Sequence, residues 1–188
     1  MLSPIEKNWD LNEGSTKVLS PQFLTFEYNP IYDLIVVEDF DGIGLNYNKT
    51  IQSDTNLLIT SDTSEVFYHP GEIPNKSGKF VLPPITLGEF KTLQAFELPK
   101  YGANVWLEVN YKTDVALVFG VTANEILQST KTPVVTLFPN EEWNKVYINL
   151  VTEVSGYPNA LDYNLFFGSI NTTDDTATVL IDNIKLLY

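Results

Sequence analysis

Polar and aromatic side chains alternate with apolar ones in two stretches of this chain. Read as strands, "NVWLEVNYK" (104–112) places Trp106, Glu108 and Asn110 on one face, and "NKVYINL" (144–150) places Tyr147 and Asn149 on one face. Flat aromatic rings stack on the C–H faces of sugars, while carboxylates and amides hydrogen-bond to sugar hydroxyls. If the two strands are neighbours, these five residues predict a carbohydrate-binding surface.

The same aromatic residues also allow a purely structural interpretation. Trp106 and Tyr147 would then pack beneath the N-terminal segment or a long loop and fill a second, smaller core. Loops offer another location for sugar binding, since Tyr68, Tyr157 and Tyr163 stand among turn-forming residues. A loop tyrosine before Pro or Gly is more often a packing anchor. Of these three, Tyr68 is included among the predicted ligand residues.

The composition excludes much of enzymology. The 188 residues contain no Cys, a single His (His69) and, read along the rows, no Arg. Thiolate nucleophiles, histidine-rich metal centres and bidentate arginine clamps are therefore ruled out. No G-x-S-x-G elbow accompanies His69, and no Gly-rich loop ends in Lys-Ser/Thr. A glycosidase needs only two carboxylates, which the 24 acidic residues formally allow, but we expect no catalysis because a sandwich of this length leaves few residues for a deep cleft.

The formal net charge of −13 limits the partners further. Such a surface repels phosphate backbones and anionic lipids, so we expect no nucleic-acid partner. No apolar run reaches the roughly 18 residues of a membrane span, so we expect no transmembrane segment. The opening "MLSPIEKNWD" also lacks the basic and apolar regions of a signal peptide.

Most of the chain is predicted to form short strands. Ten segments rich in β-branched and aromatic residues are separated by Gly, Pro, Asn and Asp, and no stretch sustains a helical apolar period. The ten segments are 32–40, 55–61, 78–84, 92–99, 104–112, 114–121, 132–138, 144–150, 163–170 and 177–188. About ten strands without helices predict an all-β fold, an antiparallel β-sandwich or barrel.

The final predicted strand contains an unexpected carboxylate. In "TVLIDNIKLLY" strict alternation would put Asp182 on one face with Leu180, Ile184, Leu186 and Tyr188. A buried ionised Asp without a partner would cost several kcal/mol, so Asp182 should be protonated, hydrogen-bonded or bound to a cation. One alternative is that it accepts backbone N–H groups and caps a bulge.

The C-terminal half resembles the galactose-binding-domain-like jelly rolls, a group that includes many carbohydrate-binding modules. The resemblance rests on "EEWNKVYINL", "YNLFFGSI" and "ATVLIDNIKLLY", and on "VVEDFDG" near the start. It covers roughly 33–188 and implies a jelly-roll β-sandwich there. Residues 1–32 have no counterpart and are interpreted as an N-terminal extension that packs on the domain or tethers it.

The resemblance carries further implications. In such jelly rolls the first and last strands are neighbours, and many hold a structural calcium there, so it implies a calcium site at Glu38, Asp41 and Asp182. The overall form also resembles small surface lipoproteins of polysaccharide-using Gram-negative bacteria. This implies an exported, non-catalytic glycan-binding module on the outer membrane or cell surface, with its leader and lipidated Cys absent from this sequence. The alternative is a structural domain whose mixed face binds a protein of a surface assembly.

Overall fold

The computed structural model describes residues 33–67 and 75–188, and within them the chain is almost entirely β. The strands are β1 (Leu34–Glu38), β2 (Tyr47–Lys49), β3 (Leu58–Thr60), β4 (Ser77–Leu82), β5 (Thr86–Thr92), β6 (Trp106–Thr113), β7 (Leu117–Asn124), β8 (Ser129–Leu137), β9 (Asn140–Asn149), β10 (Asp162–Asn171) and β11 (Ala177–Leu187). One short helix, α1 (Val151–Gly156), joins β9 to β10.

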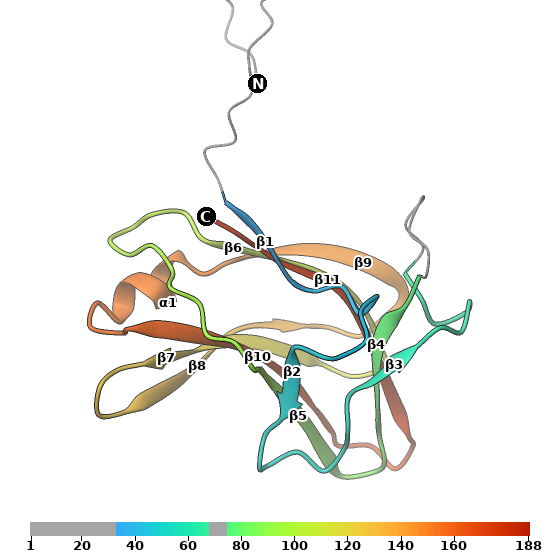
Figure 1. Cartoon of the computed structure of the whole chain (residues 1–188). Helices are drawn as coiled ribbons and strands as arrows, with labels where there is room; N and C mark the ends of the chain where they lie inside the picture. Colours follow the sequence, from blue (N-terminus) through green and yellow to red (C-terminus); the bar gives the residue numbers. More distant parts are fainter. Residues whose placement is uncertain (1–32, 68–74) are drawn as a thin grey trace, which may run out of the picture. The chain divides into compact units, whose positions relative to one another are not determined.

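The strands form two antiparallel sheets. Sheet A has the order β3-β4-β11-β6-β9, with β1 paired beside the C-terminal half of β11, and sheet B has the order β2-β5-β10-β7-β8. Figure 1 shows β1, β6, β9 and β11 in one layer, above β7, β8 and β10 in the other. Successive strands repeatedly cross between the layers, as in a jelly roll. The predicted antiparallel β-sandwich is therefore confirmed.

The core lies between the sheets and follows the period of two in the sequence. Along β6 the residues Leu107, Val109 and Tyr111 point inward, and the preceding Val105 joins them. Facing them, Phe167 at the centre of sheet B contacts the rings of four other aromatic residues: Tyr47, Phe80, Phe90 and Phe119. Residues that alternate with these inward positions therefore lie on the outer face of each sheet.

The last strand departs from the predicted alternation. Ile181, Ile184 and Leu186 all belong to the core, because the register of β11 on β6 shifts between Asp182 and Lys185. Asn183 adopts a φ of 50° within this bulge. Asp182 therefore does not share a face with Ile184 and Leu186, and the single-face prediction for this strand is wrong. A β-bulge adds a residue on one strand and reverses the alternation beyond it.

Two local predictions are also wrong. Within the segment 92–99, Thr92 ends β5 and Phe96 forms an isolated bridge with Tyr163, but the other residues are not in a strand. The strand of this region is β5. Its "TLGEFKT" contains Gly, Glu and Lys, which are uncommon in strands, but pairing with β2 and β10 on its two edges outweighs that propensity. The helix α1 was not predicted because its single turn and a half is too short to show a helical period.

The first and last strands meet, as the resemblance implied. Leu34 pairs with Leu187 and Glu38 with Ile184, and the ladder continues outward through hydrogen bonds between Asp33 and Tyr188. Just beyond β1, Phe40 is fully buried and its ring lies over Gly78 of β4. Only a glycine allows so close an approach, because a Cβ at position 78 would lie 2.4 Å from Cε1 of Phe40.

Candidate functional site

The two strands that carry the predicted ligand residues are direct neighbours. In the β6–β9 pair Trp106 stands opposite Asn149, Glu108 opposite Tyr147, and Asn110 opposite Lys145. Residues directly opposite each other in an antiparallel pair project to the same side of the sheet. The condition for a shared surface, that the strands lie side by side, is therefore met. We call the outer face formed by these six residues the β6/β9 strip.

Exposure varies strongly along the β6/β9 strip. Tyr147 is 57% exposed, Asn149 is exposed and Trp106 is half-buried, so all three are available to a ligand at the surface. Glu108 is 8% exposed and lies between them, while Asn110 is only 1% exposed. The aromatic surface open to a ligand is therefore the half of the strip toward the Trp106–Asn149 pair, and Lys145 is the exposed residue of the other half.

Glu108 is the electrostatic centre of the strip. Its Oε1 lies 2.8 Å from Nζ of Lys145 and 3.7 Å from Nζ of Lys185, which projects from β11 on the other side of β6. Burial by itself would raise the pKa of Glu108, but the hydrogen bonds from Lys145 and the Tyr147 hydroxyl outweigh it and lower the pKa. The same contacts raise the pKa of Lys145. Glu108 is thus held ionised beside Tyr147.

The inner end of the strip holds buried polar groups. Asn110 pairs across the sheet with Asp182, whose Oδ1 accepts the N–H of Asn183 at 2.7 Å and whose Oδ2 accepts the Ser77 hydroxyl at 3.1 Å. The described residues provide no hydrogen-bond partner for either amide atom of Asn110. Asp182 is 1% exposed. The structure thus contains the N–H bond at a bulge that the metal-free interpretation of Asp182 predicts.

The other two residues of the predicted calcium site are hydrogen-bonded to the chain as well. Glu38 is 3% exposed and accepts the N–H groups of Phe40 at 2.9 Å and Asn46 at 2.6 Å. Asp41 accepts the N–H of Lys76 at 2.9 Å. Burial raises the pKa of both Glu38 and Asp41.

Within the described residues, no group of three or more His, Cys, Asp or Glu side chains is placed to hold a metal ion. Calcium binding at Glu38, Asp41 and Asp182 stays a prediction. Thermal unfolding with calcium and with chelator tests it, because a ligand bound by the native state raises its stability. An unchanged melting temperature would exclude the calcium site.

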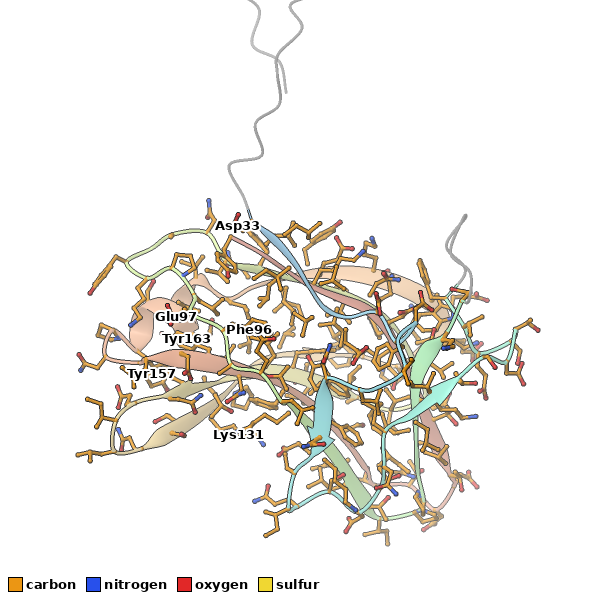
Figure 2. All side chains as sticks on the ribbon, viewed as in Figure 1. Asp33, Phe96, Glu97, Lys131, Tyr157 and Tyr163 are labelled. Carbon is orange, nitrogen blue, oxygen red and sulfur yellow. The ribbon has the colours of Figure 1, made fainter. Side chains whose placement is uncertain are left out.

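The loop aromatics separate into two cases. Tyr68, like His69, lies outside the described residues. Tyr163 is fully buried, with its hydroxyl 2.9 Å from the carbonyl oxygen of Val154 in α1, and the Tyr157 hydroxyl lies 2.8 Å from Oγ1 of Thr132 (Figure 2). Tyr157 and Tyr163 are therefore packing anchors at the end of the sandwich that α1 covers.

Sheet B carries a second polar cluster, which the sequence analysis missed. Lys131 of β8, labelled in Figure 2, forms an ion pair with Glu89 of β5 and lies 4.4 Å from the ring centroid of Phe166. Beneath that ring lies Gly120, where a Cβ would come within 2.4 Å of Cζ of Phe166. Lys131 and Glu89 are 42 residues apart in the chain, so no local pattern could have indicated the cluster. The Lys131–Glu89 ion pair therefore covers the ring of Phe166.

Comparisons with known proteins place this geometry among known folds. No model of a protein family matches the chain, and no curated protein matches its sequence. Solved structures do match. A family 11 carbohydrate-binding module of a cellulosomal cellulase from Clostridium thermocellum superposes with a TM-score of 0.53 at 13% identity, covering 82% of this chain and 94% of that one. The fold is a carbohydrate-binding-module-like jelly roll.

Two further matches cover parts of larger proteins. The family 22 module and xylanase domain of Clostridium thermocellum xylanase 10B, complexed with xylohexaose, gives a TM-score of 0.53 at 13% identity and covers 86% of this chain and 28% of that one. The enzymatically active domain of tailspike protein 4 from bacteriophage CBA120 gives 0.54 at 13% identity, covering 80% and 20%. These similarities show the fold and do not identify a ligand, which must be inferred from the surface residues.

Proposed function

We propose that this protein is a non-catalytic carbohydrate-binding module and that the β6/β9 strip binds the glycan. The observation that carries the proposal is the exposed ring of Tyr147 diagonally across from the half-buried ring of Trp106, with Glu108 and Asn149 filling the other two positions. Diagonal positions on neighbouring strands are about 7–8 Å apart, a distance that two linked sugar rings can span.

Each of these side chains has a defined part in the proposed complex. The Tyr147 ring stacks on one sugar face, and Trp106 supports the neighbouring sugar. Asn149 is exposed and offers both a donor and an acceptor to sugar hydroxyls. Glu108 stands opposite Tyr147, and its interaction with the Tyr147 hydroxyl raises the pKa of that tyrosine.

The charges of the strip argue against glycoside hydrolysis there. Hydrolysis requires two carboxylates about 5–10 Å apart, one of them with a raised pKa that lets it act as the acid. The β6/β9 strip carries a single carboxylate, and the pKa of Glu108 is lowered. A surface with these groups binds a sugar without cleaving it.

The structural neighbours support the same class of ligand. One match is the family 11 module of Clostridium thermocellum in complex with a β-1,3-1,4-mixed-linked tetrasaccharide, with a TM-score of 0.52 at 13% identity over 81% of this chain and 94% of that one. Because the identity is low, the neighbours support the proposal through the fold only.

A glycan array followed by affinity electrophoresis tests the proposal. We expect wild type to bind at least one soluble polysaccharide, and Tyr147→Ala and Trp106→Ala each to weaken binding at least tenfold, about 1.4 kcal/mol. Phe138→Ala is the matched control, because Phe138 is also exposed (76%) but precedes β9, in which the seven residue steps from Asn140 to Tyr147 span about 23 Å. Binding of no glycan above background, or equal loss in all three variants, would overturn the proposal.

The proposal includes export to the cell surface as a lipoprotein, which the family resemblance supports. Protease digestion of intact cells that express the full gene product tests this part, since a surface protein is cleaved without lysis. Among the described residues no helix is long and apolar enough to cross a membrane.

One observation favours a second function, binding to a protein of a surface assembly. The outer face next to the strip continues through Leu187 to Leu34 (61% exposed) and through Lys185 to Val36 (51% exposed). Two exposed aliphatic side chains on an edge strand are a common feature of protein interfaces. Capture of a defined partner that Val36→Lys abolishes, in a protein that binds no glycan, would favour this alternative.

A further inference from the structure

The β6/β9 strip by itself is neutral, with Lys145 and Glu108 as its charged residues, but the residues beside it add positive charge, in contrast to the chain as a whole. The net charge of the protein is −13, yet two lysines, Lys145 and Lys185, surround the single carboxylate of Glu108. Lys112 projects from the same face of β6, and the described residues give it no ion-pair partner. Among the residues paired between β6 and β11, Asp182 is the other carboxylate, and it is 1% exposed and accepts two hydrogen bonds from the chain. Glu141 and Glu142 lie at the opposite end of β9 from Tyr147.

The lysines differ in how firmly they are held. The Lys145 ammonium lies 2.8 Å from Glu108 Oε1, a hydrogen-bond distance, whereas that of Lys185 lies 3.7 Å away, beyond one. Glu108 Oε1 thus lies near two ammonium groups and is hydrogen-bonded to that of Lys145 only. Among the described residues the Lys185 ammonium forms no hydrogen bond, and its side chain is 24% exposed, so its donors are open to an acceptor that approaches between β11 and β6.

From this charge arrangement we propose that the glycan is acidic, with a carboxylate or a sulfate ester on the sugar that contacts Lys185. The inference rests on the proposed function and names its ligand class. The anionic group replaces solvent at the Lys185 ammonium while the sugar ring stacks on Tyr147. Lys185 pairs with Glu108 on one side of β6, and Tyr147 pairs with Glu108 on the other side. A compact ammonium binds an anion from several directions, so it suits either kind of charged group.

The overall negative charge does not prevent such binding at physiological ionic strength. The Debye length there is about 8 Å, so acidic groups on the far loops are screened while the ammonium groups in contact with the ligand are not. The charge near the ligand therefore determines the preference, and the distant charge mainly lowers the association rate.

The experiment compares ligands that differ only in charge. Isothermal titration at 150 mM NaCl would measure binding of polygalacturonate against its methyl ester, and of dextran sulfate against dextran. We expect one charged polymer to bind at least tenfold more tightly than its neutral counterpart, and its affinity to fall severalfold at 500 mM NaCl because screening weakens exposed charge pairs.

Three variants assign the preference to named groups. Lys185→Gln should lower the affinity for the charged polymer and leave neutral binding unchanged, whereas Tyr147→Ala should lower both. Glu108→Gln should raise the affinity for the charged polymer, because it removes the competing carboxylate. Lys100→Gln, at a lysine whose ammonium bonds the carbonyls of Pro158 and Ala160, is the matched control and should leave binding unchanged. Circular dichroism confirms that each variant is folded.

The outcomes separate this inference from the proposed function. Tight binding of a charged polymer that Lys185→Gln weakens supports the acidic ligand. Equal or tighter binding of the neutral polymers, unaffected by Lys185→Gln, overturns the acidic ligand and leaves glycan binding standing. Absence of binding to every polymer overturns both. A charged polymer bound equally by Tyr147→Ala also overturns the inference, because the anion would then be held elsewhere.

Discussion

The close approach of Phe40 to Gly78 makes a sharp test of how the first strand is joined to the sandwich. A Cβ at position 78 would lie 2.4 Å from Cε1 and 2.5 Å from Cζ of Phe40, and 3.0 Å from Cγ2 of Ile181. Contacts below 3.0 Å cannot be accommodated without movement. Phe40 is fully buried and has a φ of 60°, so its ring has little freedom to move.

We therefore expect Gly78→Ala to destabilise the protein. Overpacking of this kind costs typically about 1–3 kcal/mol. Replacing glycine with alanine also restricts the unfolded chain, which by itself would raise the free energy of unfolding by roughly 0.4–1 kcal/mol. The difference between these ranges is about 0–2.6 kcal/mol. We expect a net loss near the middle of that range, about 1.3 kcal/mol, equivalent to a fall in melting temperature of roughly 3–5 °C for a domain of this size.

A double-mutant cycle identifies the cause. Leucine at position 40 lacks the two atoms that the new Cβ would meet, so Phe40→Leu removes most of the clash, at its own cost of about 1–2 kcal/mol. The double variant should then be more stable than the sum of the single effects by at least about 1 kcal/mol. Urea denaturation followed by tryptophan fluorescence measures all four free energies of unfolding.

A matched control and a refuting result complete the test. A Cβ added at Gly44 would meet nothing within 4 Å, so Gly44→Ala should change the stability by less than about 0.5 kcal/mol. If the two changes at Gly78 and Phe40 add to within about 0.5 kcal/mol, the Phe40 ring does not limit the space at position 78. The loop after β1 would then be held on β4 by something other than this contact.

Three further changes have definite expected results. Ile85 is 80% exposed and has a φ of 57°, which is unfavourable for a β-branched residue, so Ile85→Gly should stabilise by roughly 0.5–1 kcal/mol in urea denaturation. Tyr163→Phe removes the hydroxyl that bonds the Val154 carbonyl and should cost about 1–2 kcal/mol by the same measurement. The pKa of Glu108 is lowered in the folded protein. Its ionised carboxylate therefore contributes fully to the free energy of unfolding above the ordinary glutamate pKa of about 4.3, and this contribution is lost as the pH falls through the lowered pKa. Glu108→Gln should therefore cost about 1 kcal/mol at pH 7, a value discounted because Lys145 is 41% exposed, and progressively less below about pH 4.

Each of these changes has a control that differs in one property. Ile51→Gly replaces a fully exposed isoleucine without the positive φ, and it should not stabilise. Tyr101→Phe removes a hydroxyl from a tyrosine that is 87% exposed and should be neutral. Glu142→Gln alters an exposed glutamate, so the difference in stability between this variant and wild type should not shrink as the pH falls. A stabilising Ile51→Gly, a costly Tyr101→Phe or a pH-independent effect at Glu108 would contradict the corresponding reasoning.

The sequence by itself determined the fold class and the faces of β6 and β9. Val105, Leu107 and Val109 alternate with Trp106 and Glu108, and this period of two is enough to separate a core face from an outer face because side chains alternate along any strand. The pairing of the first and last strands came from resemblance to a family, since no local pattern shows which strands are neighbours.

Only the tertiary structure decided how the strands align and where their alternation breaks. The bulge after Asp182 depends on how β11 pairs with β6, and it turns Asp182 away from the core that holds Ile184. The placement of Lys185 beside Glu108, 77 residues apart in sequence (185 minus 108), follows from that same register. Hydrogen bonds and ion pairs between distant strands depend on register, which local sequence specifies only weakly where a bulge intervenes.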